Sequence, residues 1–390
     1  MPKEIVLAGK SLDHAMHAAH EGELCLARCQ RRNFTPGSCA STQQDIDDLG
    51  LSMVRFYLPS EEPLDISVTS KSEMFQSEGL GHHLMPQRLP QGALVRAGGH
   101  VLMPSPEAYF VRRCADIHDI PECLALGMEL TGRYSRETPG EHGEHCTYFC
   151  QPLTTARRIA GYVERAKGMR GAQYARQALP WLLDNSFSPM ETLLATLLVL
   201  PPRHRGANLE PPQLNPEMPV PPELRHLTRR DTFKPDLYWP QYKLDVEYDS
   251  NERHSTPEER VMDDERKSDI ESLRIRVIPM RTEDLTSRDA FERKLGQIVQ
   301  HMADHGDAKS RRRLRRLHSR DALDAIDSLR RELLPPLEWL ATGVGASPSE
   351  GTGYADIPAP DVDALLADPD VPYDLPPSPI DDLLGGPYFP

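Results

Sequence analysis

The segment from residue 231 to residue 254 constrains the fold of this 390-residue chain more than any other part. Over residues 242–249, apolar and charged side chains alternate, which places them on opposite faces of a β-strand. The apolar face carries Tyr242, Leu244, Val246 and Tyr248, and the charged face carries Lys243, Asp245, Glu247 and Asp249. Residues 233–239 are predicted to form a neighbouring strand, joined through a short turn at Pro240 and Gln241. The sequence therefore predicts a β-hairpin with one charged face.

This hairpin is expected to gather acidic side chains on adjacent strands. Asp236 should lie beside Glu247, with Asp249 two residues further along the same face. Clustered carboxylates repel one another and raise each other's pKa unless a cation lies between them. Mg²⁺ suits such a site because a couple of carboxylates hold it, while water and a substrate phosphate complete its coordination. The charged face therefore predicts a Mg²⁺ site, for which Mn²⁺ is the alternative ion.

Residues 181–285 resemble the very-short-patch-repair endonuclease-like branch of the PD-(D/E)XK nuclease superfamily. The resemblance rests on an ordered set of motifs: an acid-bearing helix, a Pro-Asp hairpin, a histidine, an Asp-x-x-Arg helix and a final aliphatic strand. In this chain the motifs are Ser188-Pro189-Met190-Glu191, Pro235-Asp236, Glu247-x-Asp249, His254, Asp263-x-x-Arg266-x-x-x-Ile270 and Arg276-Val277-Ile278. What the resemblance implies is an α/β, restriction-endonuclease-like fold, with a mixed sheet flanked by helices.

The resemblance also implies metal-assisted hydrolysis of phosphodiester bonds, in DNA rather than RNA. Asp236 and Glu247 would ligate the metal, and Asp249 would be either a further metal ligand or a group that positions the water. The remaining site residues would be His254 as general acid or phosphate-polarising group, Glu191 as the helix acid and Arg266 as a phosphate contact. A structural role stays open for each of these three residues. Glu191 also fits a capping box in which Ser188 is the N-cap. His254 also fits a residue in a turn, and Arg266 also fits a partner in an ion pair.

The chain departs from the family pattern at three positions. Asp249 stands where the superfamily has its lysine, and Ser250 and Arg274 stand where glycines are usual. Without that lysine, one positive charge that would orient water and steady the transition state is missing. Two functions are therefore open: a Mg²⁺-dependent DNA endonuclease of a bacterial defence or repair type, and a non-catalytic DNA-binding or antitoxin-like regulator that keeps a degenerate nuclease fold.

Residues 1–150 are predicted to form a smaller mixed α+β domain. Pro104-Ser105-Pro106-Glu107 is a helix-start signal that leads into residues 108–117. Through residues 100–117, the segment 1–150 resembles the AbiEi-type antitoxin-like proteins, which implies a protein partner if the chain is part of a defence or toxin–antitoxin system. The predicted order is the 1–150 domain, a basic helical connector (151–180), the nuclease-like domain (181–305), a basic helix (306–340) and a tail (341–390).

Two basic stretches are candidates for contacts with a nucleic-acid backbone. Residues 154–177 hold six Lys or Arg against Glu164, and residues 309–334 hold nine Lys or Arg. The candidate contacts are Arg157, Arg158, Arg312 and Arg316. A solvated helix face is the alternative. In the second stretch, Leu314, Leu317, Ala325, Leu329 and Leu333 are expected to pack while the arginines face solvent.

The last 50 residues, 341–390, form an acidic, Pro-rich tail that is predicted to be disordered. The tail holds nine acidic residues and no Lys or Arg, so the first 340 residues carry a net charge of −5 instead of the overall −14. That balance leaves a nucleic-acid partner open. The chain has no apolar run near 18 residues and no signal-peptide pattern, and its seven cysteines favour reduced thiols. We therefore expect a cytoplasmic protein without a membrane partner.

Overall fold

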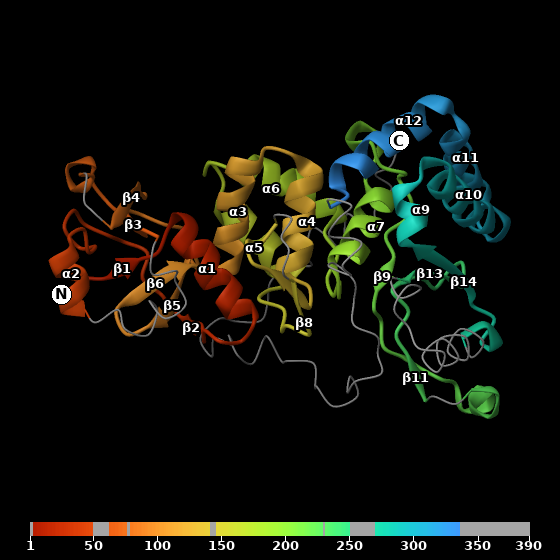
Figure 1. The fold of residues 1–390 in the computed structure, drawn as a ribbon, viewed down its shortest axis with the longest axis horizontal. Helices are drawn as coiled ribbons and strands as arrows, with labels where there is room; N and C mark the ends of the chain where they lie inside the picture. Colours follow the sequence, from red (N-terminus) through yellow and green to blue (C-terminus); the bar gives the residue numbers. More distant parts are fainter. Residues whose placement is uncertain are drawn as a thin grey trace. The chain divides into compact units, whose positions relative to one another are not determined.

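The computed structural model describes residues 3–49, 62–75, 79–140, 146–228, 231–249 and 270–335. The chain divides into two compact units, the first ending at Leu182 and the second beginning at Leu183 (Figure 1). Both units combine helices with strands, so the α/β class predicted from the sequence is confirmed at this coarse level. In the described part of the chain, no helix is both long and apolar enough to cross a membrane.

The first unit contains a four-stranded sheet in the order β1-β6-β5-β2. Its strands are β1 (Ile5–Val6), β2 (Ala27–Arg28), β5 (Leu94–Gly98) and β6 (Val101–Pro104). Strand β1 runs parallel to β6, and β5 pairs antiparallel with both β6 and β2. A further parallel pair and a short antiparallel hairpin complete its strands: β3 (Leu64–Val68) with β4 (Leu80–Leu84), and β7 (Tyr134–Arg136) with β8 (Cys146–Tyr148).

Three helices of the first unit, α3, α4 and α5, begin at side chains that cap them, namely Ser105, Asp119 and Thr155. Ser105 caps helix α3, because its hydroxyl accepts a hydrogen bond from the N–H of Ala108, and Pro106 occupies the first turn. The predicted helix start is thus confirmed. The helices and 3₁₀ turns of this unit are α1 (Gly9–His20), α2 (Gln43–Leu49), η3 (Lys71–Glu73), α3 (Pro106–Ile117), α4 (Ile120–Leu130), α5 (Ala156–Arg165), α6 (Ala172–Ala178) and η4 (Leu179–Trp181).

The stretch predicted as a basic connector is part of the first unit. Helices α5 and α6 both pack against α3, and α6 also packs against α4. Their apolar sides are buried, as Ile159, Val163 and Ala175 show. The division between the units therefore follows these helices rather than preceding them.

The second unit is built on a mixed sheet in the order β14-β13-β12-β9. Strands β13 and β14 are parallel, whereas β12 is antiparallel to β13 and to β9. Its strands are β9 (Gln213–Leu214), β10 (Met218–Pro219), β11 (Thr232–Phe233), β12 (Leu237–Trp239), β13 (Leu244–Asp249) and β14 (Arg276–Arg281). Its helices and 3₁₀ turns are α7 (Pro189–Val199), η5 (Pro202–His204), η6 (Pro222–Leu227), α9 (Thr282–Thr286), α10 (Arg288–His305), α11 (Ala308–Leu314), η7 (Arg315–His318) and α12 (Arg320–Leu333).

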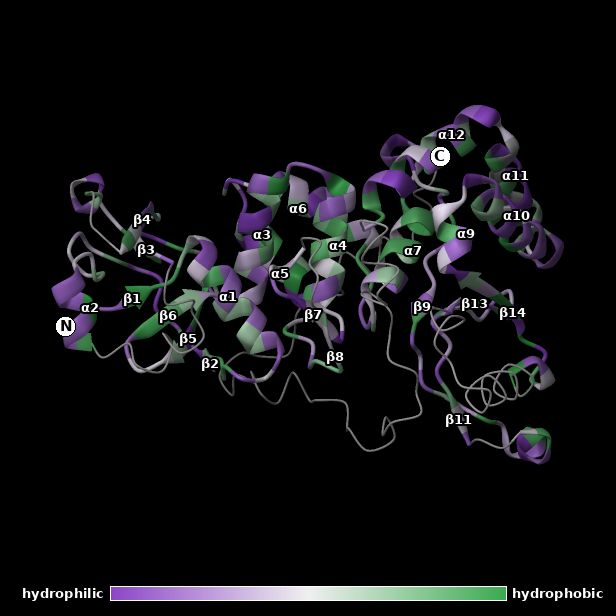
Figure 2. Cartoon of the chain, in the orientation of Figure 1, coloured by the Kyte–Doolittle hydropathy of each residue, from purple (hydrophilic) through white to green (hydrophobic). Residues whose placement is uncertain are grey.

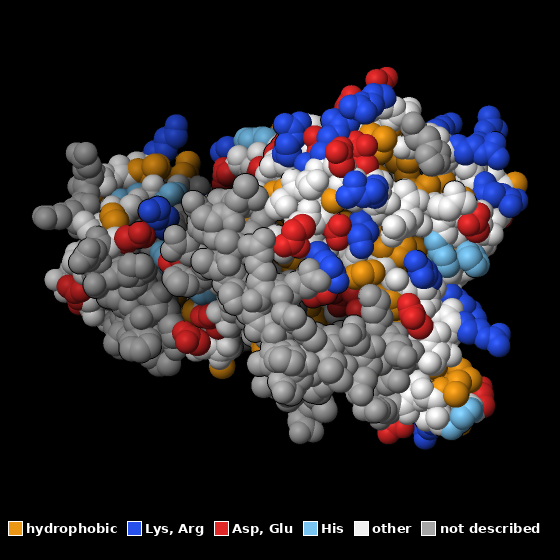
Figure 3. All heavy atoms as spheres, turned by 45° about the vertical axis from the view of Figure 1, so that its right-hand side comes forward, with side chains coloured by type: hydrophobic (Ala, Val, Ile, Leu, Met, Phe, Trp, Pro, Cys, Tyr) orange, Lys and Arg blue, Asp and Glu red, His pale blue; other side chains and the backbone are white. Residues whose placement is uncertain are grey.

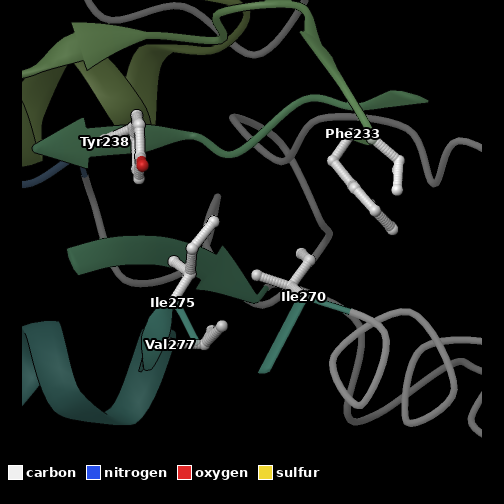
Figure 4. Packing of buried hydrophobic residues seen from close by; sticks show 6 residues of the cluster. Phe233, Tyr238, Ile270, Ile275 and Val277 are labelled. Atoms are coloured by element: carbon white, nitrogen blue, oxygen red, sulfur yellow. The ribbon is translucent and has the colours of Figure 1, made fainter. Parts of the chain in front are cut away.

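Apolar side chains cover both faces of the strands β12–β14. On one face a cluster joins Tyr238 and Val277 to Phe233, Ile270 and Ile275 (Figure 4). The opposite face of the same strands is also buried, through Leu237, Trp239, Leu244, Val246, Ile278 and Met280. Helix α7 is mostly apolar, as its largely green colour in Figure 2 shows, and it is buried from Met190 to Val199, including Glu191.

The basic stretch 309–334 differs from the single helix that the sequence predicts. It divides into α11, η7 and α12, and Ser319 starts α12 by accepting a hydrogen bond from the N–H of Ala322. Four of the predicted packing residues are buried, namely Leu314, Leu317, Leu329 and Leu333.

Two predicted positions in this stretch differ from the structure. Ala325 is half-buried, and Ile326 beside it enters the core. The expectation that the arginines face solvent is wrong for Arg330, whose side chain is buried. Its guanidinium donates to the carboxylate of Asp327 and to the carbonyl of Leu285, so its charge and its donors are satisfied inside the protein.

Candidate active site

The predicted hairpin is present as β12, a tight turn and β13. Its register pairs Tyr238 with Asp245 and Leu237 with Val246. The N–H groups of Tyr242 and Lys243 donate to the carbonyls of Trp239 and Pro240, and Lys243 adopts a left-handed conformation with φ of 46°. The turn therefore spans residues 239–243, slightly longer than the Pro240–Gln241 turn expected.

Asp236 lies next to the acidic half of β13. The hairpin register, continued by one residue beyond the Leu237–Val246 pair, sets Asp236 opposite Glu247. The carboxylate of Asp236 accepts a hydrogen bond of 2.8 Å from the backbone N–H of Tyr248, the residue after Glu247. Asp236, Glu247 and Asp249 are all half-buried. The structure thus brings Asp236 together with the Glu-x-Asp segment, as the sequence suggested.

Arg281 is a charged neighbour of this group that the sequence reasoning missed. Strands β13 and β14 are parallel and pair Glu247 with Pro279 and Asp249 with Arg281. The Nε atom of Arg281 lies 3.8 Å from Oδ2 of Asp249. Both are the last residues of their strands, so they meet at one edge of the sheet. A parallel pairing between segments 32 positions apart leaves no local sequence signal, which is why this contact was not predicted.

Asp245 shares the charged face of β13 but is buried, with 0% of its surface exposed. It lies between its register partners Tyr238 on β12 and Val277 on β14, two members of the apolar cluster. Burial, and secondarily the charge of Asp245, raise the pKa of Tyr238. The charged face therefore changes along the strand: it is covered at Asp245 and half-buried from Glu247 onward.

Glu191 occupies the start of α7, where its carboxylate is enclosed by hydrogen-bond donors. One oxygen accepts from the N–H of Phe187 (2.9 Å) and from the side-chain amide of Asn215 (2.6 Å), and the other accepts from the hydroxyl of Ser188 (3.0 Å). Ser188 is the N-cap of the helix, accepting from the N–H of Glu191. The residue is 2% exposed, and this burial raises the pKa of its carboxyl to about 7.

Asn215 connects Glu191 to Asp236, the residue directly before β12. Besides the amide contact with Glu191, its backbone N–H donates to the carbonyl of Asp236 (3.0 Å). Asn185 holds the asparagine from the other side, since each of the two side-chain amides donates to the other residue's backbone carbonyl. Among the described contacts, the structure therefore links Glu191 to Asp236 through Asn215. Ser188 is the N-cap as expected, whereas the Glu191 carboxylate accepts from the N–H of Phe187 and the hydroxyl of Ser188; the reciprocal bond of a capping box, from the N–H of Ser188, is not among the described contacts.

The remaining sequence candidates lie apart from this group or outside the described residues. His254 and Arg266 fall within 250–269, which the structure does not describe. In the first unit, Arg157 is exposed and Arg158 pairs with Glu107 at 3.1 Å.

In the second unit, Arg312 and Arg316 are exposed on α11 and η7. Figure 3 shows blue Lys and Arg side chains along the top and right of this unit, with red acidic side chains among them. The exposed arginines are therefore available to a nucleic-acid backbone, although acids interrupt the surface around them.

The donor set at the end of β13 is chemically suited to a hard divalent cation. Mg²⁺ is commonly held by one or two carboxylates, with water and substrate phosphate as its other ligands. Asp236, directly before β12, and Glu247, on the neighbouring strand β13, are both half-buried and meet that requirement. No preformed group of three or more His, Cys, Asp or Glu ligands was found among the described residues. Comparisons with family models, with curated proteins and with solved structures found no match for this chain.

Proposed function

We propose that this protein is a metal-dependent endonuclease that hydrolyses phosphodiester bonds in DNA. The observation that supports this most is the position of Asp236, opposite Glu247 across the hairpin, with its carboxylate bonded to the N–H of Tyr248. Two carboxylates held side by side, one directly before β12 and one on β13, are the minimum that a Mg²⁺-dependent phosphodiesterase site needs. Under this proposal the second unit has a restriction-endonuclease-like core.

In this proposal the residues of the chain bind and orient the reacting groups. Asp236 and Glu247 hold the ion, with Mn²⁺ as a substitute for Mg²⁺, and the backbone N–H of Tyr248 fixes the direction of the Asp236 carboxylate. A bound divalent ion supplies two effects: it lowers the pKa of a water molecule, and it neutralises charge on the scissile phosphate. Asp249 orients the attacking water, and His254 donates the proton that the leaving oxygen needs.

DNA is the proposed substrate because exposed basic residues are present on the same unit. Arg312 and Arg316 lie on α11 and η7, where phosphates of a duplex can reach them. Duplex DNA carries regularly spaced phosphates, and neutralising them with arginine releases counterions. We place the protein in the cytoplasm, in a defence or repair role.

A second candidate is a DNA-binding or antitoxin-like regulator that keeps the fold without the chemistry. The burial of Glu191 favours it, because the helix acid that the nuclease resemblance would place in the site is here enclosed by the N–H of Phe187, the hydroxyl of Ser188 and the amide of Asn215. The helices of the first unit would then bind a protein partner.

A nicking assay on supercoiled plasmid DNA, with and without Mg²⁺ or Mn²⁺, separates the two candidates. Metal-dependent nicking that Asp236→Asn abolishes supports the endonuclease. DNA retardation in a gel without nicking under any of these ions supports the regulator.

A further inference from the structure

Arg281 ends β14 on the same face of the sheet as the candidate metal ligands. In parallel strands the side chains of register partners project to the same side. Arg281 pairs with Asp249, and Pro279, two residues before it, pairs with Glu247. The guanidinium therefore projects beside the carboxylates at the edge of the sheet, with its Nε 3.8 Å from Oδ2 of Asp249.

The side chains of this ion pair are partly exposed, unlike those of the buried acids Asp245 and Glu191. The side chains of Arg281 and Asp249 are 41% and 37% exposed, whereas Asp245 and Glu191 are buried. An exposed pair at 3.8 Å adds little to folding stability. It does, however, hold a positive charge where a phosphate that approaches Glu247 and Asp249 would arrive.

The backbone around Arg281 is fixed on both sides. Its N–H donates to the carboxylate of Asp284 (3.0 Å), a residue in the first turn of α9. The next residue, Thr282, exchanges a 3.0 Å hydrogen bond with the hydroxyl of Tyr248 on β13. The Cα of Arg281 is thereby held in one place relative to Asp249, and a group held in place stabilises a transition state better than a mobile one.

We propose that Arg281 is the cation that contacts the scissile phosphate in this site. It takes the role for which this chain has no lysine, since Asp249 stands at the lysine position. A guanidinium stays protonated at any working pH, and its planar fork of N–H donors matches the geometry of a phosphate. Its contact strengthens as negative charge develops on the phosphoryl oxygens, so it acts mainly on the rate. This inference rests on the proposed nuclease function.

The test compares single-turnover nicking of supercoiled plasmid, with Mg²⁺ and protein in excess, by wild type, Arg281→Gln and Arg281→Lys. We expect about a 100-fold slower rate for Arg281→Gln, the size of effect seen when one donor to a developing oxyanion is removed. Arg281→Lys keeps the charge and should retain part of the rate. Arg276→Gln, at the exposed start of the same strand, is the matched control and should nick at the wild-type rate.

Two further measurements separate contact with phosphate from a structural role. Binding of a short duplex with Ca²⁺ in place of Mg²⁺ should change less than threefold in Arg281→Gln, because the contact acts on the rate. If Arg281 merely neutralises Asp249, the double variant Arg281→Gln with Asp249→Asn should nick no more slowly than Asp249→Asn alone; under our proposal the double variant is slower. Arg281→Met, which keeps the length of the side chain without its charge, replaces Arg281→Gln if that variant fails to fold.

The outcomes distinguish this inference from the function on which it rests. A wild type that does not nick DNA with either ion overturns the nuclease proposal and this inference together. A wild type that nicks, with Arg281→Gln equally fast or with the double variant no slower than Asp249→Asn alone, overturns the role of Arg281 alone.

Discussion

Asn215 and Glu191 are joined by a 2.6 Å hydrogen bond inside the second unit, from the side-chain amide to the carboxylate. The same asparagine donates its backbone N–H to Asp236, the first residue of the candidate metal site. It adopts a left-handed conformation, with φ of 45°, in which asparagine is tolerated better than most side chains. The start of α7 and the first metal ligand are thus positioned by one residue.

Glu191 should make the stability of the protein depend on pH. Burial raises the pKa of its carboxyl from 4.5 to about 7 in the folded protein. Between these values the folded form holds a proton that the unfolded form releases, so the stabilising effect is complete below about 4.5 and is lost as the pH rises to about 7. At about 1.4 kcal/mol per pKa unit, the loss amounts to at most about 3 kcal/mol.

Urea unfolding of wild type and Glu191→Gln at pH 5 and pH 8 measures this effect. The free energy of unfolding of wild type should fall more between the two pH values than that of Glu191→Gln, which has no proton to lose at this position. Equal pH dependence in the two proteins would show that Glu191 is ionised throughout.

Arg274 should tolerate glycine better than alanine. It has φ of 62°, in the left-handed region, at the position before β14 where the nuclease resemblance has a glycine. A Cβ costs about 1 kcal/mol in this conformation. We therefore expect Arg274→Gly to be about 1 kcal/mol more stable than Arg274→Ala in urea unfolding.

The control for Arg274 is Arg276, two residues later in the extended conformation of β14. There the order should reverse, with Arg276→Gly less stable than Arg276→Ala, because glycine weakens a strand. A preference for alanine at both positions would contradict the strain argument.

Arg330 should contribute more to stability than its neighbour Arg331. Its side chain is buried and donates to Asp327 at 2.5 Å and to the carbonyl of Leu285. Arg330→Leu removes a positive charge that is bonded to the buried carboxylate of Asp327. We therefore expect the free energy of unfolding to fall by about 3 kcal/mol. Arg331 contacts the same carboxylate from the surface, with 67% of its side chain exposed, and Arg331→Leu should cost about 1 kcal/mol or less. Equal losses in the melting profiles of the two variants would show that burial of Arg330 adds nothing.

The acidic tail is expected to weaken non-specific DNA binding. Residues 341–390 hold nine acids and no base, and they follow a segment in which Arg312 and Arg316 are exposed. A tethered acidic segment competes with phosphate at a high effective concentration. Deleting residues 341–390 should raise the affinity for a DNA duplex several-fold at low salt, with a smaller gain at moderate salt because of screening. An unchanged affinity at low salt would leave the tail a solubilising role only.

Local patterns predicted the parts of the fold that depend on local physics. The alternation over 242–249 predicted β13, and Ser105-Pro106 and Ser188-Pro189 predicted the starts of α3 and α7. These signals act within a few residues, so they can be read from the sequence.

Features that depend on packing between distant segments were missed. The contact of Arg281 with Asp249 requires the parallel pairing of β13 with β14. Asp245 was placed on a charged face, yet the cluster around Tyr238 and Val277 covers it. Arg330 was expected to be exposed because arginine is a charged residue. Its hydrogen bonds to Asp327 and to the carbonyl of Leu285 make its burial favourable. Sequence periodicity gives the face of a strand or helix, but not what covers that face.

The central claim is that Asp236 and Glu247 hold a metal ion that supports DNA cleavage. The most direct measurement is the rate of Mg²⁺- or Mn²⁺-dependent nicking of supercoiled plasmid by wild type, Asp236→Asn and Glu247→Gln. Asparagine keeps an oxygen to accept from the N–H of Tyr248, so the hairpin is preserved while the charge is removed. Asp231→Asn, an exposed change in the same segment, is the control. The account predicts nicking by wild type and Asp231→Asn and none by the two site variants; full activity in either site variant would contradict it.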